Sequence, residues 1–417
     1  MSLWRHTDFL KLWAGQTVSQ FGSQITMLAL PLTAALTLHA SVAQMGLLSA
    51  AGTAPYLLIG LFTGVLVDRV RRRPILIVTD LGRFALLMLI PALALADLLR
   101  IEYLYDIAFL VGVLTIFFEI AYEAFLPTLV ARTQLTDGNG KLETTRSAAQ
   151  VAGPGVAGVL AQLVTAPVAI FADALSFLVS ALFLWSIRTP EPVLAPRAHR
   201  ASVWREIGEG LRIVSHQPLL RPVIACTAAI NLFWSMMGAI YVLYATRTLG
   251  IQPGVLGAIF TVGSVGLVVG AVFAGGITRR LGPGPTIIAG AVAMACGKML
   301  IPLVHGPSVM AVPVLIISSF ISGFGGVVFN INTRTLRQSV TPDHLMGRVT
   351  ATSRFLVWGG LPIGALAGGT LGAVFGLRLT LFIGAAGMLL AFLWPLCSPV
   401  RALREQPALP EEQVYAA

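Results

Sequence analysis

Six ionisable residues lie inside long apolar runs of this sequence, and they are the first candidates for chemistry. An ionised group inside such a run is costly if the run lies in a membrane, so it is expected to pair or to serve function. All the carboxylates of this set lie in the first half, and Asp343 is the only acid between residue 222 and the C-terminal tail. Any proton coupling through carboxylates should therefore use the first half. The six residues are Asp80, Arg83, Glu119, Glu123, Asp173 and Lys298.

Helix counting separates these residues by depth. At 1.5 Å per residue, Arg83 and Glu123 lie at the same level, roughly 12 Å from the end of their runs. We therefore interpret Arg83 and Glu123 as a structural pair, with proton coupling as the alternative role of Glu123. Asp80 lies one turn away and is also able to reach Arg83. Glu119 lies one turn deeper than Glu123 on the same face. Two like charges repel there, so at least one should hold its proton near neutral pH.

Glu119 is the better candidate for this titrating group, and a structural hydrogen bond to a neighbouring helix is the alternative. Asp173 lies near one end of its run, where it could brace the helix or take part in proton coupling. Lys298 could extend to the membrane surface or pair across helices. The three cysteines and six histidines are scattered, and no paired acids or His–Asp set lies outside the runs. We expect no catalytic residues, metal or cofactor.

The composition requires a membrane environment for these runs. Apolar residues make up 56% of the 417 residues and charged residues only 11%, against about 25% charged in soluble domains. The mean hydropathy is +0.83. Net charge is +10, but the basic residues lie between apolar runs, where they set topology, so nucleic-acid binding is not expected.

A membrane-spanning helix needs about 20 apolar residues, and twelve such runs are present. No cleavable signal peptide is recognisable, so the first run should stay as a helix. We predict an all-α membrane protein with twelve transmembrane helices in two pseudo-symmetric six-helix bundles. The runs are 10–38, 43–67, 75–97, 104–131, 146–165, 167–187, 221–247, 253–277, 285–305, 308–332, 347–373 and 377–397.

The arginine distribution predicts the topology. With the N-terminus in the cytoplasm, the inside loops include DRVRRR at 68–73, the loop 132–146 and the stretch from Arg334 to Arg354. The outside loops hold only Arg100, Arg247 and Arg378. This positive-inside pattern places both termini in the cytoplasm of a bacterial inner membrane.

The chain divides into two related halves. We expect an N-terminal bundle at 1–187, a linker at 188–220, a C-terminal bundle at 221–397 and a tail at 398–417. Trp204 to Val214 in the linker reads as an amphipathic helix on the membrane surface. Arg146 precedes Pro154 by the same interval as Arg354 precedes Pro362. Duplicated halves form a central site in many secondary transporters.

The segment GVLVDRVRRRP, from Gly64 to Pro74, resembles the signature loop of the major facilitator superfamily. The resemblance implies that Asp68 braces a cytoplasmic gate, with Gly64 as the packing glycine and Arg69 and Arg72 in the basic turn. In the second half, AGGITRRLG has Thr278 in place of the aspartate. A symmetric charged gate is therefore not expected.

The segment GPGVAG resembles the glycine–proline motif of exporters and antiporters in the superfamily, which implies gating roles for Gly153, Pro154 and Gly158. Further segments resemble the branch that contains macrolide efflux proteins and the enterobactin exporter, although Ser23 follows Gly22 where that branch commonly has an acid. These segments are FLKLWAGQTVSQFG, LPTLV at 126–130, DALSFLVSA at 173–181 and EGLR at 209–212.

Polar residues in the first and seventh runs predict the wall of a substrate cavity, because these two helices line the central cavity in the superfamily. They are Gln16, Gln20 and Gln24, and Asn231 with Trp234; Tyr122 and Trp358 would add aromatic walls. We expect a monomeric exporter of small amphiphilic molecules (a drug-like compound, macrolide or siderophore) by proton antiport, with membrane lipids and protons as partners. The alternatives are a lysophospholipid or other lipid translocator and, more remotely, an integral-membrane enzyme or receptor.

Overall fold

The computed structural model describes residues 3–67, 70–189, 191, 203–304, 308–405 and 407, and these residues form helices and connections with no β-strand. Ten of the described helices are long and apolar enough to cross a membrane. The first run, which forms α1 and the π-helical turn η2 (Thr33–Thr37), and the second, which is divided into α2 and α3 at Ile59, bring the number of spans to twelve. The expected all-α membrane fold is confirmed.

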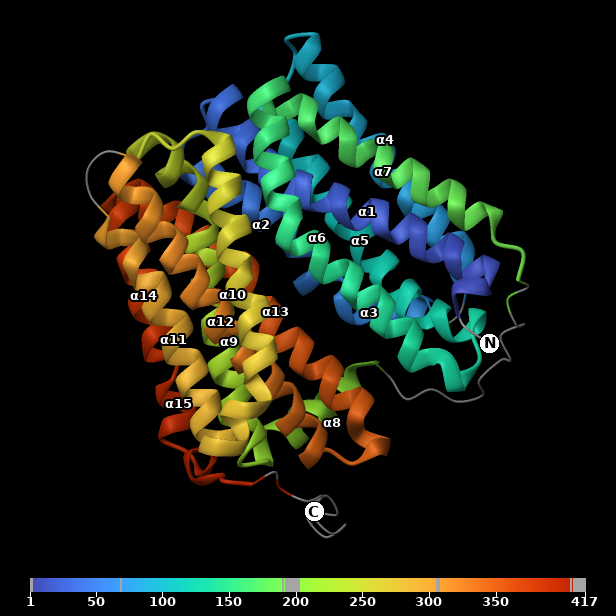
Figure 1. Ribbon diagram of the computed structural model, residues 1–417, viewed down its shortest axis with the longest axis vertical. Coiled ribbons are helices and arrows are strands. Elements are labelled where there is room, and N and C mark those ends of the chain that lie inside the picture. Colours follow the sequence, from blue (N-terminus) through green and yellow to red (C-terminus); the bar gives the residue numbers. More distant parts are fainter. Residues whose placement is uncertain are drawn as a thin grey trace. The chain divides into compact units, whose positions relative to one another are not determined.

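The chain forms two compact units, which are described separately. The first comprises residues 1–198 together with 245–261. Within it, α1 packs against α6 and α7, and α4 packs against α5 and α7 (Figure 1). Its helices are α1 (Thr7–Leu32), α2 (Val42–Leu58), α3 (Gly60–Val67), α4 (Arg72–Leu95), α5 (Ile101–Leu129), α6 (Leu135–Val164) and α7 (Ala166–Ser186), followed by the first turns of α10 (Pro253–Leu281).

The second unit comprises residues 199–244 and 262–417. Helix α9 packs against α13, and α11 packs against α12. The linker helix expected from Trp204 to Val214 is present as α8. Besides the rest of α10, the unit contains α8 (Val203–His216), α9 (Leu220–Leu243), α11 (Pro283–Leu303), α12 (Ser308–Val340), α13 (Asp343–Phe375), α14 (Leu377–Leu390) and α15 (Leu393–Leu396).

Two stretches expected to be loops are largely helical. Helix α6 begins at Leu135, inside the expected 132–146 loop. Between Arg334 and Arg354, only two residues separate α12 from α13. The expectation was wrong because hydropathy detects where a run leaves the bilayer, whereas a helix can continue into water with its backbone hydrogen bonds intact.

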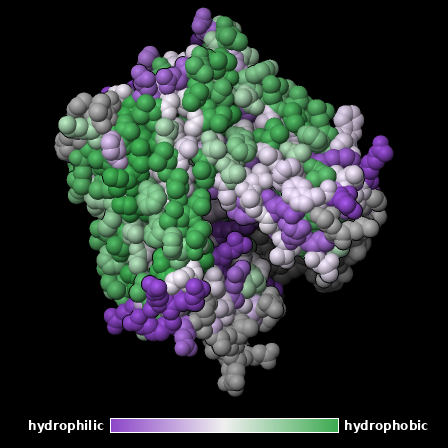
Figure 2. Space-filling model, in the orientation of Figure 1, coloured by the Kyte–Doolittle hydropathy of each residue, from purple (hydrophilic) through white to green (hydrophobic). Residues whose placement is uncertain are grey.

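The outer surface of the second unit carries large apolar side chains. Val272, Phe273 and Val374 are more than half exposed, and Figure 2 shows a broad hydrophobic band over this unit that ends in a hydrophilic patch. A soluble monomer rarely exposes so large an apolar area. This surface is suited to lipid.

Repeated backbone features support the duplication predicted from sequence. The π-helical turn η2 follows α1, and a second π-helical turn, η4 (Tyr244–Thr248), follows α9. Beyond them, the N–H of Ala40 donates to the carbonyl of Ala34, and that of Ile251 to the carbonyl of Ala245. The junction between α6 and α7 has Thr165 at φ +89°, and the junction between α13 and α14 has Gly376 at φ +83°.

Candidate transport site

Asp80 and Arg83 form a buried ion pair on α4. A guanidinium N–H of Arg83 donates to the carboxylate of Asp80. The same guanidinium lies 4.3 Å from the ring centroid of Phe118 and 4.1 Å from that of Phe177. Both charged side chains are almost fully buried, so each depends on the other for compensation. The predicted Asp80–Arg83 contact is present, and the Arg83–Glu123 pair stays a prediction.

Two candidate glutamates of α5, Glu119 and Glu123, lie on the surface of the first unit. They are both exposed and one turn apart, which agrees with the shared face expected from their spacing. The hydroxyl of Tyr56 on α2 donates to Oε1 of Glu119 at 3.5 Å. Tyr122 is half-buried beside them and stacks on Phe118, with ring centroids 5.9 Å apart.

Asp173 lies at the contact between α7 and α1. Its side chain is buried and accepts a hydrogen bond from the hydroxyl of Ser176 at 3.0 Å. On α1, a Cβ placed on Gly22 would lie 2.6 Å from Oδ1 of Asp173. Gly22 thus lets α1 approach this carboxylate closely, and the bracing role expected for Asp173 fits its position. A role in proton coupling stays a prediction.

The glycine–proline motif of α6 crosses the first turns of α10 within the first unit. A Cβ on Gly158 would lie 2.5 Å from the carbonyl oxygen of Pro253 and 2.9 Å from Cα of Gly257. The relationship is reciprocal, because a Cβ on Gly257 would overlap the carbonyl oxygen of Pro154. The backbones therefore touch along a seam that only glycine permits. Gly153 faces a different helix, since its Cβ would overlap the side chain of Gln24 on α1.

The basic turn before α4 is fastened to the start of the linker. Backbone N–H groups of Arg72 and Arg73 donate to the carboxylate of Glu191 at 2.7 and 3.3 Å, and the Arg72 side chain lies 3.5 Å from the same carboxylate. A carboxylate at this position stabilises the N-terminus of a helix. Asp68 and Arg69, the central gate residues implied by the resemblance, lie outside the described residues, and Gly64 lies in α3.

In the second half, a neutral contact occurs where the first half has Asp68. The hydroxyl of Thr278 on α10 donates to the side-chain oxygen of Asn332 on α12 at 2.9 Å. Asn332 is buried, and its amide donates to the carbonyl of Val328. A hydrogen bond between two neutral side chains thus joins α10 and α12. It lies near the end of α10 that carries arginines, and we call this side of the protein, where most of the arginines lie in the sequence, the arginine-rich end.

The polar residues expected to line a cavity are partly used in helix packing. On α1, Gln16 is buried, whereas Gln20 and Gln24 are half-buried. On α9, the Asn231 amide donates to the carbonyl of Val357 on α13 at 3.1 Å. Trp234 is exposed, and Trp358 is half-buried with the Arg354 guanidinium 5.9 Å from its ring centroid. Their place in a cavity stays a prediction.

Three features escaped the sequence reasoning. Two of them are the contacts of Asp8 and Glu191, because nothing in their local sequence identifies the backbone groups that they bind. The third feature, the seam, had a detectable signal: PGVAG at 154–158 is repeated as PGVLG at 253–257. These two copies are the segments that meet.

Comparison with known proteins identifies the family. The profile of the transmembrane secretion effector family matches residues 1–416. The chain belongs to this family, in the major facilitator superfamily. It is 26% identical to the multidrug efflux pump Tap of Mycolicibacterium fortuitum, covering 88% of this chain and 90% of that protein. It is 27% identical to macrolide efflux protein A of Streptococcus pyogenes over 49% of this chain and 51% of that protein.

The solved structures agree on the fold. A mutant of the nucleoside transporter NupG superposes with a TM-score of 0.78 at 10% identity, covering 94% of this chain and 99% of that chain. At this identity, the likeness shows the fold alone. Because it belongs to the family named above, the protein is a multi-pass transporter of the major facilitator superfamily.

Proposed function

We propose that this transporter exports small amphiphilic molecules from the cytoplasm by alternating access, coupled to proton entry. The observation that carries the proposal is the similarity to the efflux pump Tap along nearly the whole of both chains. The partial match to macrolide efflux protein A points to the same class of cargo. The positive-inside arginines support a bacterial inner-membrane protein with both termini in the cytoplasm.

For the proton carrier we propose Glu119. It is an exposed carboxylate on a membrane-spanning helix, with Glu123 one turn away and the Tyr56 hydroxyl in contact. The phenol can donate a hydrogen bond to the ionised form of Glu119. Such a carboxylate can exchange a proton between the two sides of a membrane. Asp173 is the next candidate, although its burial between α1 and α7 favours a bracing role.

The seam between α6 and the start of α10 is the proposed gate element. Its backbones are in direct contact at Gly158 and Gly257, and the Gln162 side chain joins the two helices by accepting from the N–H of Gly254 at 3.0 Å. A change in helix tilt would break both contacts. The region around Gly64, Asp68, Arg69 and Arg72 is the proposed gate element at the arginine-rich end, on the strength of the family resemblance.

Proteoliposomes with an imposed pH gradient test the proposal. A pH-sensitive dye inside the vesicles should report substrate-dependent proton movement when a macrolide or a cationic dye is added. Glu119→Gln keeps the size and polarity of the side chain but cannot titrate. It should abolish gradient-driven transport while binding of the same compound, measured by tryptophan quenching, is retained.

Glu102→Gln is the matched control, because Glu102 is an exposed acid in the first turn of the same helix. It should transport like the wild-type protein. Uphill transport by Glu119→Gln would remove Glu119 from the mechanism, and Asp173 would be tested next. If neither the macrolide nor the cationic dye increased proton movement in the wild-type protein, the result would contradict proton antiport.

A further inference from the structure

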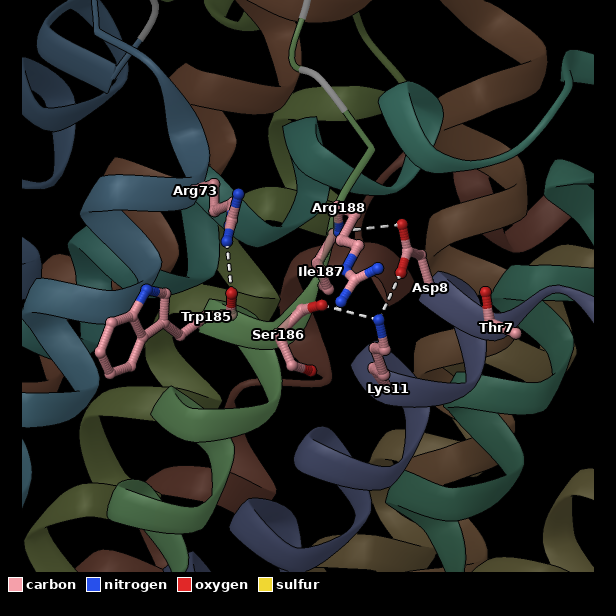
Figure 3. A pocket seen from close by; sticks show the side chains of 8 residues that line it. All are labelled: Thr7, Asp8, Lys11, Arg73, Trp185, Ser186, Ile187 and Arg188. Atoms are coloured by element: carbon pink, nitrogen blue, oxygen red, sulfur yellow. Dashed lines mark hydrogen bonds and ion pairs between the residues drawn. The ribbon is translucent and has the colours of Figure 1, made fainter.

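A basic pocket opens at the arginine-rich end of the first unit, between the start of α1 and the end of α7. Its volume is about 850 Å³, within the range of about 300–1,000 Å³ usual for small-molecule sites. Figure 3 shows the charged residues that line it, which are Asp8, Lys11, Arg73 and Arg188. This pocket takes no part in the transport function proposed above.

The charges around the pocket do not balance. Lys11 is paired with Asp8 at 2.8 Å, and the nearby Glu191 is paired with Arg72. The Arg73 guanidinium donates to two neutral backbone carbonyls, those of Leu184 and Trp185. The exposed Arg188 side chain has no hydrogen bond or ion pair to any described residue. Two positive charges therefore remain without an anionic partner in the part of the chain that the structure describes.

Asp8 cannot serve both arginines, because its oxygens are already used. One accepts from Lys11, and the other accepts from the backbone N–H groups of Arg188 and Thr189 and from the Thr189 hydroxyl. Burial alone raises the pKa of Asp8, but these hydrogen bonds outweigh it and hold the pKa well below its usual range. The carboxylate stays ionised and saturated, so a further anion would have to come from outside the chain.

The position of the pocket indicates which anion this would be. Trp185, which lines the pocket, is 72% exposed and lies at the end of a membrane-spanning helix. Exposed tryptophans at such positions typically sit among lipid headgroups. Next to it on α7, Leu182 is 53% exposed and suited to acyl chains. Basic pockets between helices on the cytoplasmic side are suited to anionic headgroups.

We propose that this pocket binds the phosphate of an anionic phospholipid from the leaflet at the arginine-rich end of the protein. Arg188 and Arg73 contact the phosphate, Lys11 borders it, and Trp185 lies against the glycerol and upper acyl chains. Arg73 also holds the carbonyls at the end of α7, so headgroup binding would stabilise the packing of α7 against α1 and α4.

Native mass spectrometry of the delipidated full-length protein tests this proposal by titration with short-chain phosphatidylglycerol, phosphatidylcholine or inorganic phosphate. The wild-type protein should bind phosphatidylglycerol in preference to phosphatidylcholine. Arg188→Gln should weaken that binding about fivefold, from the usual contribution of one basic residue near anionic lipid. Arg188→Lys, which keeps the charge, should restore most of it.

Arg280→Gln is the matched control, because it removes an exposed arginine at the end of α10. It should bind phosphatidylglycerol like the wild-type protein, and the melting temperatures of both glutamine variants should be unchanged. Equal binding by Arg188→Gln and the wild-type protein would overturn the proposal. Displacement of the lipid by an equal concentration of inorganic phosphate would also overturn it, because it would identify a free-anion site.

Discussion

Asp8, in the first turn of α1, holds the chain that leaves α7 by accepting a hydrogen bond from the backbone N–H of Thr189 at 2.8 Å. The same oxygen accepts from the Thr189 hydroxyl at 2.7 Å. Because these residues are far apart in sequence, one carboxylate fixes the start of α1 to the segment that leaves α7.

Asp8→Asn should therefore lower the stability of the protein at neutral pH. An amide oxygen can replace part of the hydrogen bonding, but the charge that pairs with Lys11 is lost. Hydrogen bonds to charged groups contribute about 1.5–3 kcal/mol, so we expect a loss of about 1–2 kcal/mol, measured by thermal unfolding in detergent.

The pH dependence of that loss follows from the lowered pKa of Asp8. A carboxylate with a lowered folded-state pKa stabilises the protein above its unfolded pKa of about 3.9. This stability is lost as the pH falls through the folded-state pKa. The difference between the wild-type protein and Asp8→Asn should thus be constant from pH 7 to about 5 and shrink below about pH 4. A difference that does not change down to the lowest pH tolerated would argue against this role of the charge.

Asp80→Asn should destabilise the first unit severely, since it leaves Arg83 buried without a counter-ion. Removing one member of a buried pair costs about 3–5 kcal/mol, which should appear as poor expression and early unfolding. Adding Arg83→Met should recover stability. Asp137→Asn breaks an exposed pair with Lys141 and should cost under about 1 kcal/mol. Equal losses of stability in Asp80→Asn and Asp137→Asn would show that burial of the ion pair does not determine its contribution.

Gly158→Val and Gly257→Val should each block transport while leaving the protein folded. A side chain at either position would overlap the facing backbone, and overpacking of about 1–3 kcal/mol changes the population of the packed form about 5- to 150-fold. Gly140→Val is the control, because this glycine lies on α6 as well and no atom beyond its own helix backbone lies within 4 Å of a Cβ there. Transport assays in proteoliposomes should show loss only for the seam variants.

Thr165→Gly should stabilise the protein. Thr165 has φ +89° and ψ +152°, a conformation nearly restricted to glycine, and the equivalent junction in the second half has Gly376. Relief of this strain should raise stability by about 1 kcal/mol. The reverse substitution, Gly376→Thr, should lower the melting temperature. No change in either variant would show that the strain is relieved locally.

The sequence was sufficient to predict the fold because each membrane-spanning segment of about 20 apolar residues must form all its backbone hydrogen bonds within itself, as a helix does. The break between the fifth and sixth runs, expected at Ala166 and Pro167, occurs where α6 ends at Val164 and α7 begins. Helix ends beyond the bilayer were predicted less well, since polar residues continue α6, α12 and α13.

Side-chain partners were harder to predict. Helix periodicity placed Glu119 and Glu123 on one face and Asp80 within reach of Arg83, because those relations are local. It gave no information on the rotation of one helix against another. The use of Asn231 in packing against α13, or of Asp8 and Glu191 to hold the linker, depends on that rotation.

The seam between α6 and α10 has a consequence for how its sequence can vary. Each PGVxG copy supplies the backbone surface against which the other is fitted, and both positions already carry the smallest residue. A larger residue at 158 therefore cannot be compensated by any change at 257, nor the reverse. A library that randomises both positions together should return glycine at both after selection for transport.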